Sequence, residues 1–549
     1  FMKPFKKCLL GRCSSALIIT PITPFAVSCS TDEVASLIKD ETIKQFKEID
    51  LIPHASNVNG TLNSQEKIKA YYKKYIENLG LTWVNQENGA DYEGSAYFDI
   101  PATKGWEDKK PIILQGHMDI VFVAPSGTDR TNYQINLVEK EINGEPVICS
   151  DGTTNIGADD GVGIGTMLAL AKYRDKYNHG PIRCIFTTDE EEGCVGAKYV
   201  PESWFKMGDQ QINDLLNLDS EELTELTVAS SGVYRPVFSC DFENTNIVTN
   251  LSSNSEITTY QISATGFNGG HTSNLYRYIQ PMEPIMDCLK DLLVNYQEFY
   301  LSDIETDKGL EKSTGVPKNA YLQISVNTKG IDIKNQLQGD INVIMNMLLE
   351  KFPEESRDAK CSVIKVDNPS QALNKETSNN IYTLLATLPT GRIIYNVTDQ
   401  DKNTNGNLSP VVLKVNDSTN GNFTVTTMLR SFDDDLIAEY KSKMNKAYTD
   451  YLSSYKNAKK AIDSEYVAWL GKDNSLIQLL AKGYNSVNIN PTVTYINAGL
   501  ETSWFARYVK NQATTGPTAT HAHETSETLY LNTITPYIKI VLYTLANLN

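Results

Sequence analysis

Five short stretches of the chain combine histidine, aspartate or glutamate with glycine or other small residues, a composition typical of metal sites. They read GHMD at 116–119, GADDG at 157–161, TDEEEG at 188–193, NLDSEE at 217–222 and THAHE at 520–524. The chain has only six histidines. His117 and His523 lie in these stretches, and His271 lies in a further one, GGHT at 269–272. We therefore expect these histidines to take part in metal-dependent chemistry.

His117 and Asp119 are two residues apart just after an apolar run, so in an extended chain their side chains point the same way. A histidine ligand needs a second group to fix the orientation of its ring, and Asp119 could supply that group. Taken alone, such a pair is better explained by a surface turn. Asp159 stands among small residues, and its two oxygens could bridge two cations. The alternative is a helix N-cap, a role that suits Asp160 more than Asp159.

Glu190 and Glu191 are adjacent, so their side chains point in different directions. One can bind a metal while the other faces the substrate as a general base. An acidic run is usually solvated surface, but an apolar run precedes this one. Asp219 also follows an apolar run, where a carboxylate is often structural. Near the end of the chain, His523 and His521 are the candidates for a nitrogen ligand.

Two imidazoles and three carboxylates would give each of two cations three ligands if one carboxylate bridges them. Nitrogen and oxygen ligands without thiolate suit Zn²⁺, and also accommodate Mn²⁺ or Co²⁺. Such two-metal sites hold their ions about 3.5–4 Å apart and bring bound water to a pKa of about 7. The motifs together therefore predict a site for two divalent cations.

The elements that must position these groups follow the order of an α/β fold. Apolar runs at 111–115, 183–187 and 215–218 predict buried strands, each ending at one motif, and 161–177 predicts a helix. Functional groups of such sheets gather at the carboxyl ends of the strands. The segment 33–80 is expected to be helical. The last part of the chain is expected to return near residue 460 with a segment at 477–484, a strand at 492–496 and a helix at 533–548.

After residue 236 the pattern changes to that of an α+β insertion. We expect strands at 258–265, 318–328 and 422–431, with helices at 281–300, 341–351 and 435–451. The segment 401–422 is rich in Asn, Thr and Gly and predicts a hairpin or mobile loop.

The composition is that of a globular protein of two or three domains: 549 residues, of which 40% are hydrophobic. A net charge of −17 without a long basic run argues against nucleic-acid partners. The cysteines after Cys29 show no CxxC spacing, so we expect buried free thiols.

The N-terminus has the pattern of an export signal. Basic residues precede an apolar stretch at 15–27, which ends in AVSC at 26–29. This resembles a bacterial lipobox, in which Cys29 would be acylated. Pro21 and Pro24 argue against an uncleaved anchor helix. The expected protein is exported and lipid-anchored to the outer face of the cell membrane.

The motifs resemble those of the two-zinc exopeptidase superfamily, which includes carboxypeptidase G, aminoacylase and, nearest to this chain, the aminoacyl-histidine dipeptidases (peptidase D). The resemblance covers nearly all of the chain after about residue 40. It is carried by IPH at 52–54, KPIILQGHMD at 110–119, GADDGVG at 157–163, NLDSEE at 217–222, GGH at 269–271, AGLE at 498–501, GPT at 516–518 and AH at 522–523.

The resemblance implies a zinc-exopeptidase catalytic domain, with a mixed, largely parallel sheet and helices on both faces, and an inserted α+β lid domain. The corresponding divisions are a leader at 1–29, the catalytic domain at 33–236 and 456–549, and the lid at 237–455. A homodimer through the lid is left open.

The resemblance also assigns roles. His117, Asp159 and Asp219 would hold one zinc, and Asp159, Glu191 and His523 the other. Glu190 would be the general base, Asp119 would orient His117, and the peptide bond between Asp159 and Asp160 would be cis. In the lid, His271 would stabilise the oxyanion, Asn319 would lie near the substrate, and Arg430 would bind the substrate carboxylate.

Three motifs depart from the dipeptidase pattern. NAGLET at 497–502 replaces HAGLEC, ETSE at 524–527 replaces SPDE, and PKN at 317–319 replaces LRN. The metal set is intact, whereas a preference for histidine-containing dipeptides is called into question. The sequence therefore predicts a dinuclear exopeptidase for dipeptides or short peptides. The alternatives are an N-acyl amino acid amidohydrolase on the same scaffold and a non-catalytic peptide-binding lipoprotein.

Overall fold

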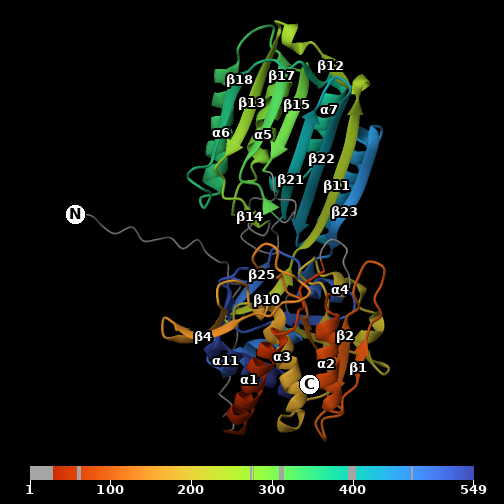
Figure 1. Cartoon of the computed structure of the whole chain (residues 1–549), viewed down its shortest axis with the longest axis vertical. Helices are drawn as coiled ribbons and strands as arrows, with labels where there is room; N and C mark the ends of the chain where they lie inside the picture. Colours follow the sequence, from red (N-terminus) through yellow and green to blue (C-terminus); the bar gives the residue numbers. More distant parts are fainter. Residues whose placement is uncertain are drawn as a thin grey trace, which may run out of the picture. The chain divides into compact units, whose positions relative to one another are not determined.

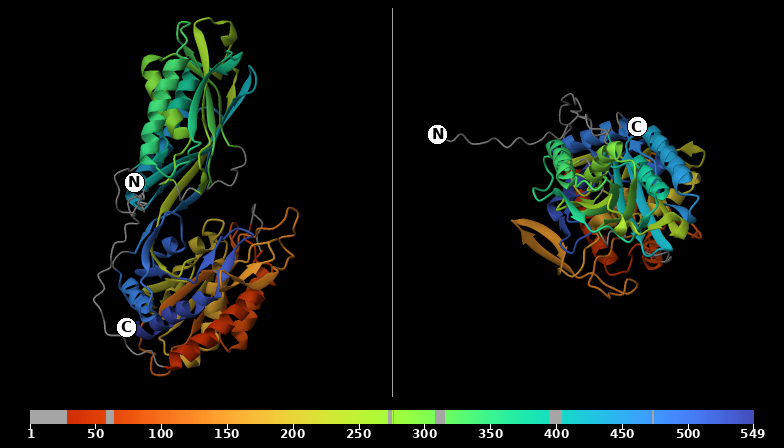
Figure 2. Two further views of the ribbon diagram at one scale, coloured as in Figure 1. Left: turned by 90° about the vertical axis from the view of Figure 1, so that its left-hand side faces the viewer. Right: turned by 90° about the horizontal axis from the view of Figure 1, so that it is seen from above.

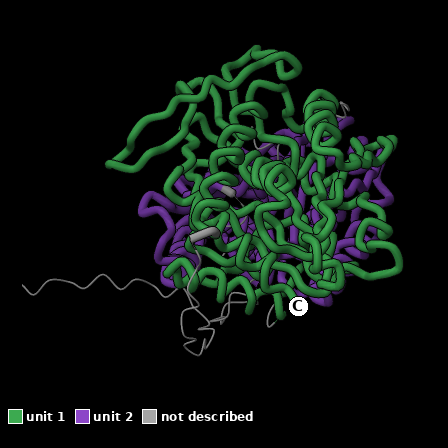
Figure 3. Tube along the Cα trace, turned by 90° about the horizontal axis from the view of Figure 1, so that it is seen from below, with its two compact units in different colours: residues 1–230, 469–549 green, residues 231–468 purple. Residues whose placement is uncertain are grey.

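The structure is a computed structural model, and it describes residues 29–57, 64–271, 275, 277–307, 315–393, 404–471 and 474–549. The chain divides into two compact units (Figures 1 and 3). Unit 1 combines the residues up to Ser230 with Trp469–Asn549, and unit 2 is Ser231–Ala468. Unit 1 is therefore formed by the first and last parts of the sequence, with unit 2 inserted between them. Motifs that are far apart in the sequence can thus lie in the same folded unit.

The main sheet of unit 1 has the strand order β1-β2-β6-β3-β9-β26-β10-β24, with β25 beside β10. The central strands β6, β3, β9 and β26 are parallel. Their apolar residues are buried on both sides, as expected for parallel strands covered by helices. The bounds are β1 Trp83–Asn85, β2 Ala96–Ile100, β3 Ile112–His117, β6 Ile182–Thr187, β9 Asp214–Asn217, β10 Glu225–Ser230, β24 Trp469–Leu470, β25 Thr492–Ile496 and β26 Asn511–Thr514.

Helices cover both faces of this sheet. Ile112 and Leu114 of β3 pack into a cluster that also contains residues of α1, α3, α9 and α11, whereas Ile113 packs on the other side with residues of α4 and α10. Within the first layer α1 and α3 lie side by side (Figure 1). A side chain at Gly165 would come within 2.9 Å of the Thr42 carbonyl oxygen, so glycine allows this close packing. The helices are α1 Cys29–Ile49, α2 Glu66–Asn78, α3 Ala158–Lys172, α4 Val195–Tyr199, α9 Ser475–Ser486, α10 Thr502–Phe505 and α11 Ile534–Asn547.

A smaller antiparallel sheet in unit 1 brings distant segments together in the order β27-β28-β5-β4. The loop between β27 and β28 contains His523, and β28 pairs with β5, Thr528 opposite Cys149. The segment that follows β5 leads to α3 and Asp159. This sheet therefore places the C-terminal motif beside the GADDG motif. The bounds are β4 Leu137–Ile142, β5 Glu145–Ser150, β27 Ala519–Thr520 and β28 Thr528–Tyr530.

Unit 2 is built on an antiparallel sheet with the order β18-β13-β17-β15-β21-β22-β11-β23, and β20 on β21. Its helices share one apolar cluster with the sheet, and α5 and α6 pack against each other (Figures 1 and 2). The strands are β11 Gly232–Glu243, β13 Ile257–Thr265, β15 Phe299–Thr306, β17 Ala320–Asn327, β18 Lys360–Val366, β20 Gly391–Arg392, β21 Thr404–Val415, β22 Asn420–Ser431 and β23 Lys456–Tyr466, and the helices are α5 Met282–Asn295, α6 Lys334–Lys351, α7 Lys375–Thr387 and α8 Asp434–Tyr451.

One sequence-based expectation for unit 2 needs correction, and another is confirmed in one of its two alternatives. The helix predicted at 281–300 ends at Asn295, because its apolar spacing stops at Leu293 and an alternating strand begins at Phe299. Most of the segment 401–422 is the long strand β21, which forms a hairpin with β22. For the described residues of this segment, the hairpin alternative is confirmed, whereas the mobile-loop alternative is wrong because most of the strand is buried between β15 and β22. The four-part domain division stays a proposal, and the pairing of β11 with β23 favours limits near residues 230 and 468.

Residues 1–28 of the leader expected at 1–29 lie outside the described residues, and so does the side chain of Cys29, the first residue of α1. In the part of the chain that the structure describes, we find no helix with the length and apolar character needed to cross a membrane. The cysteines of that part, Cys149, Cys184, Cys194, Cys240, Cys288 and Cys361, are buried and free, as expected.

Candidate metal centre

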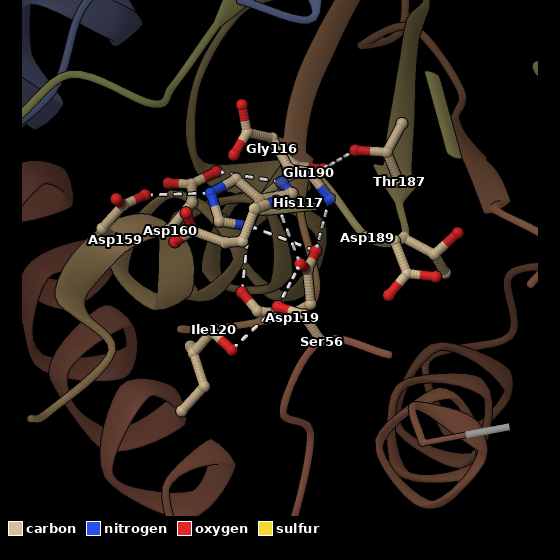
Figure 4. A network of polar contacts seen from close by, with 12 residues as sticks. Ser56, Gly116, His117, Asp119, Ile120, Asp159, Asp160, Thr187, Asp189 and Glu190 are labelled. Carbon is tan, nitrogen blue, oxygen red and sulfur yellow. Dashed lines mark hydrogen bonds and ion pairs between the residues drawn. The ribbon is translucent and has the colours of Figure 1, made fainter. Parts of the chain in front are cut away.

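His117 is the last residue of β3 and is fully buried by its neighbours (Figure 4). Its Nδ1 lies 2.9 Å from the Asp119 carbonyl oxygen and 3.4 Å from Asp119 Oδ1. Its Nε2 lies 2.9 Å from Asp159 Oδ1 and 3.8 Å from Asp219 Oδ1. Burial lowers the pKa of His117, but the surrounding carboxylates, Asp219 first, outweigh it and raise that pKa well above the usual value. The ring is thus fixed through Nδ1 and presents Nε2 to a cluster of negative charge.

Asp119 connects this imidazole to the two glutamates. Its carboxylate accepts hydrogen bonds from Ser56 Oγ at 2.8 Å and from the backbone N–H groups of Glu190 and Glu191 at 3.0 and 3.3 Å. Burial would raise the pKa of Asp119, but the hydrogen bond with His117 and these N–H donors lower it. One ionised side chain therefore orients both the ring of His117 and the turn that carries Glu190 (Figure 4). The same turn presents Glu191.

Asp159 and Asp160 point in different directions at the start of α3, and the peptide bond between them is cis. Asp160 turns inward, where its carboxylate accepts from the N–H groups of His117 and Gly163, both at 3.2 Å. A Cβ at Gly116 or Gly163 would lie 2.0 or 2.2 Å from this carboxylate, so both positions require glycine. Asp159 is left facing the imidazoles.

The carboxylate of Asp159 lies between the two imidazoles. Oδ1 is 2.9 Å from His117 Nε2, and Oδ2 is 3.2 Å from His523 Nε2. His523 Nε2 is also 2.9 Å from Glu191 Oε1. Burial lowers the pKa of His523, but its contacts with Asp159 and Glu191 raise it to about 11. This is the arrangement that a bridging carboxylate between two cations requires.

Within the described residues, three groups of side chains bring potential ligand atoms within 4.8 Å of one another. They are His117 with Asp159 and Asp219, His117 with Glu190 and Glu191, and Asp159 with Glu191 and His523. The structure thus brings together the five residues predicted as metal ligands and the predicted base, Glu190. His521, the other late histidine, is exposed and belongs to none of these groups.

The charge balance of the centre fits divalent cations. Burial and the nearby Asp159 raise the pKa of Asp219 to about 6, that of Glu191 to about 7 and that of Glu221 to about 8. Burial, together with Glu191 and Asp219, also raises the pKa of Glu190 well above its usual value. So many carboxylates repel one another in a buried place, and positive ions would relieve that repulsion. The donor atoms are nitrogen and oxygen, as Zn²⁺, Mn²⁺ or Co²⁺ prefer.

The residue predicted to stabilise the oxyanion, His271, and the two predicted to bind substrate, Asn319 and Arg430, belong to unit 2. His271 is in β14 (Gly270–His271), which pairs with β16 (Gly315–Val316), and its side chain lies outside the described part. Asn319 is exposed, donates through Nδ2 to Asp307 Oδ1 at 2.8 Å and accepts from Gly266 N–H at 3.2 Å. Arg430 of β22 is buried, and its Nη1 lies 3.2 Å from Tyr466 Oη and 3.4 Å from Ser231 Oγ.

Sequence reasoning missed the polar groups that support the strand ends. The Glu501 carboxylate accepts from Thr187 Oγ1 at 2.8 Å and from the Gln115 side chain, and Gln115 in turn accepts from Asn217 Nδ2 at 2.8 Å. These bonds tie β6, β3 and β9 together next to the metal ligands. The available signal was a polar residue at the end of each apolar run.

The chain matches the family model described as Peptidase family M20/M25/M40 over residues 113–547. The protein belongs to this family. It is therefore a metallopeptidase, a hydrolase, and divalent metals are the cofactors of its family. The predicted recognition of the metallo-exopeptidase type is confirmed.

Relatives of this family member agree with that assignment. The cytosol non-specific dipeptidase of Escherichia coli (strain K12) is 25% identical over 508 residues, which cover 90% of this chain and 94% of the relative. Peptidase T of Staphylococcus carnosus (strain TM300) is 26% identical over 219 residues, 35% of this chain and 52% of the relative. The crystal structure of aminoacylhistidine dipeptidase from Vibrio alginolyticus superposes with a TM-score of 0.73 at 20% identity, covering 94% of this chain and 98% of that one. The predicted fold class is thereby confirmed.

The prediction of an exported lipoprotein is wrong. The relative that matches 90% of this chain is named a cytosol dipeptidase, and the expected lipid anchor and outer-face location find no support among these relatives. A basic stretch followed by an apolar one and a cysteine is a short compositional pattern, and it carries less information than a match along the whole fold.

Proposed function

We propose that this M20-family peptidase is a dinuclear exopeptidase that hydrolyses dipeptides or short peptides. The observation that carries the proposal is the place of the Asp159 carboxylate, with one oxygen near His117 and the other near His523. One cation would be held by His117, Asp159 and Asp219, and the other by Asp159, Glu191 and His523. When bound, such ions acidify water and polarise the scissile carbonyl. Zn²⁺ suits these ligands, with Mn²⁺ or Co²⁺ as alternatives.

Glu190 is the proposed general base. It belongs to the group formed with His117 and Glu191, and Asp119 holds the backbone N–H of Glu190 at 3.0 Å. Its carboxylate would take a proton from the attacking water and deliver it to the nitrogen of the leaving amine. Asp119 would keep His117 oriented, because its carboxylate bonds to Ser56 Oγ and to backbone N–H groups and leaves the carboxylate of Glu190 available for the proton.

For the substrate we propose a peptide with a free carboxylate, bound by Arg430, because a guanidinium can form paired hydrogen bonds to a carboxylate. His271 is proposed to stabilise the oxyanion and Asn319 to lie near the substrate. These roles rest on the motif resemblance, with support from the whole-chain similarity to dipeptidases.

The test combines elemental analysis with digestion of a dipeptide panel, run beside a panel of N-acyl amino acids. We expect two divalent cations per chain and cleavage of dipeptides. Preferred cleavage of acyl groups would replace the proposal with an amidohydrolase, and stoichiometric binding without cleavage would point to a peptide-binding protein.

Glu190→Gln tests the base. We expect a loss of turnover of about 10²–10⁴-fold with the metal content unchanged, since an amide cannot accept the proton. Glu192→Gln, in the same acidic run but exposed, is the matched control and should keep full turnover. Retained turnover in Glu190→Gln would exclude the role.

A further inference from the structure

The segment that leads into Asp159 directs three successive backbone N–H groups at one buried carboxylate. Ile156 and Gly157 donate to Glu527 Oε2 at 2.8 and 2.9 Å, and Ala158 donates to Glu527 Oε1 at 2.9 Å. Glu527 is 1% exposed. These donors stand at the N-terminus of α3, where N–H groups have no partner inside the helix and the helix dipole favours an anion. Glu527 thus satisfies the start of α3 from a position about 370 residues away.

The backbone conformation explains why the N–H groups converge. Gly157 has φ 61° and ψ 35°, a left-handed conformation that bends the chain so that neighbouring N–H groups surround one anion. A Cβ at Gly157 would lie 2.7 Å from Ile120 Cγ2, so a larger residue is excluded on steric grounds as well. The GADDG motif therefore supplies the binding concavity, and Glu527 fills it.

Glu527 also belongs to the segment that carries His523. It ends the loop between β27 and β28, and the next residue, Thr528, is held opposite Cys149 of β5. Asp159 lies two residues after Gly157, and its Oδ2 is 3.2 Å from His523 Nε2. One buried carboxylate therefore joins the two segments whose side chains form the His523 half of the metal centre.

We propose that Glu527 is a positioning residue for the cation between Asp159, Glu191 and His523. Its carboxylate bonds to backbone N–H groups and fixes the backbone that leads to Asp159 next to the loop that carries His523. This inference rests on the proposed dinuclear function. Mutation of a residue that orients a metal ligand without binding the metal itself typically lowers metal affinity by about 10–100-fold.

The experiment uses the full-length protein, stripped of metal and titrated with Zn²⁺ against a competing chelator. Glutamine has the same size as glutamate, but its amide –NH₂ cannot accept a hydrogen bond. In Glu527→Gln at least one of the three backbone N–H groups therefore loses its acceptor. We expect the ion held by Asp159, Glu191 and His523 to bind about 10–100-fold more weakly. The ion of the His117 set shares only Asp159 with the loop of His523, so its affinity should fall clearly less. Glu524→Gln is the matched control: Glu524 is exposed in the same loop and accepts from Ser526 Oγ at 3.0 Å, and its loss should leave both affinities unchanged.

The thermal unfolding of the metal-free proteins separates positioning from folding. If Glu527→Gln weakens both ions alike, in step with a lower melting temperature of the metal-free protein, Glu527 is only a structural cap and the inference fails. It also fails if wild type and variant bind both ions equally well. If the wild type itself does not bind two ions, the proposed dinuclear function is wrong, and this inference is wrong as well. Should Glu527→Gln not fold, Glu527→Asp keeps the charge on a shorter side chain and must weaken the same ion more than the other.

Discussion

The two imidazoles of the centre are held in different ways. His117 ends a central strand, its side chain is 0% exposed, and Asp119 fixes its ring. His523 lies in a loop with φ 64°, and its side chain is 45% exposed. One half of the centre is therefore built by the parallel sheet, and the other half by a loop that depends on side-chain contacts such as those of Glu527. The difference indicates that the His523 half should exchange its ion more readily.

Asp159→Asn should have the largest effect because this carboxylate belongs to both halves. An amide leaves one good acceptor oxygen, so both cations should bind more weakly than after loss of an outer partner, which costs about 10–100-fold. Elemental analysis and peptide hydrolysis measure the result. Asp151→Asn, an exposed change a few residues earlier, is the control. Retention of both ions at wild-type affinity would show that Asp159 does not bridge.

Removal of metal by a chelator tests directly whether the His117 half and the His523 half of the centre release their ions at different rates. We expect two phases in the time course of metal release, with the faster one assigned to the His523 half because that side chain is exposed. His523→Ala should abolish the fast phase and His117→Ala the slow one. His521→Ala, in the same loop but outside the ligand groups, should release metal as the wild type does. A single phase would show that the two halves are equivalent.

Ser56→Ala should weaken the His117 half moderately. Ser56 Oγ donates to the buried Asp119 carboxylate, and a hydrogen bond to a charged group contributes about 1.5–3 kcal/mol. The free energy of unfolding in urea should fall by about that amount. Metal should be retained, since the Glu190 and Glu191 N–H groups still hold Asp119. A change as small as that of Ser64→Ala, whose hydroxyl donates to a neutral carbonyl, would contradict this expectation.

Asp50→Asn should have the smallest effect. It should change the pH dependence of the free energy of unfolding, and only above about pH 4. Asp50 follows α1, is fully buried, and neither carboxyl oxygen has a partner among the described residues. Burial and the nearby Glu527 raise its pKa well above 3.8. Below pH 3.8 the folded and unfolded forms are both protonated. At higher pH the unfolded form ionises first, so the wild type loses stability with rising pH and Asp50→Asn does not.

Urea unfolding of both proteins at a series of pH values measures this difference. The variant should become relatively more stable as the pH rises from about 4. A difference that does not change with pH would mean that Asp50 is ionised in the folded protein and has a partner.

The elements near the site could be predicted because their signals are local. The apolar run before His117 indicated a buried strand, and β3 begins and ends within two residues of it. In unit 2 the same reasoning left two alternatives at β21, a hairpin or a mobile loop, because Asn and Thr residues are typical of loops. The burial of that strand depends on β15 and β22 on either side, which a local pattern does not contain.

The residues of the metal centre likewise differ in how clearly the sequence indicates them. His117, Asp159, Glu190 and Glu191 stand out in the sequence because histidine and paired carboxylates beside glycine are rare in an ordinary surface. Ser56, Asp160 and Glu501 do not stand out. Their importance comes from hydrogen bonds to groups between 43 and 386 residues away, and no spacing rule connects such partners.

The sequence by itself determined which residue types are present for metal chemistry and which segments are strands or helices, since both depend on side chains a few positions apart. Only the tertiary structure decided that the two oxygens of Asp159 lie near different imidazoles, and that Glu527 reaches the start of α3. The contact of Asp159 with His523 and that of Glu527 with the start of α3 join segments more than 360 residues apart. They form because the parallel strands and the β5–β28 pairing fold distant backbone into one place.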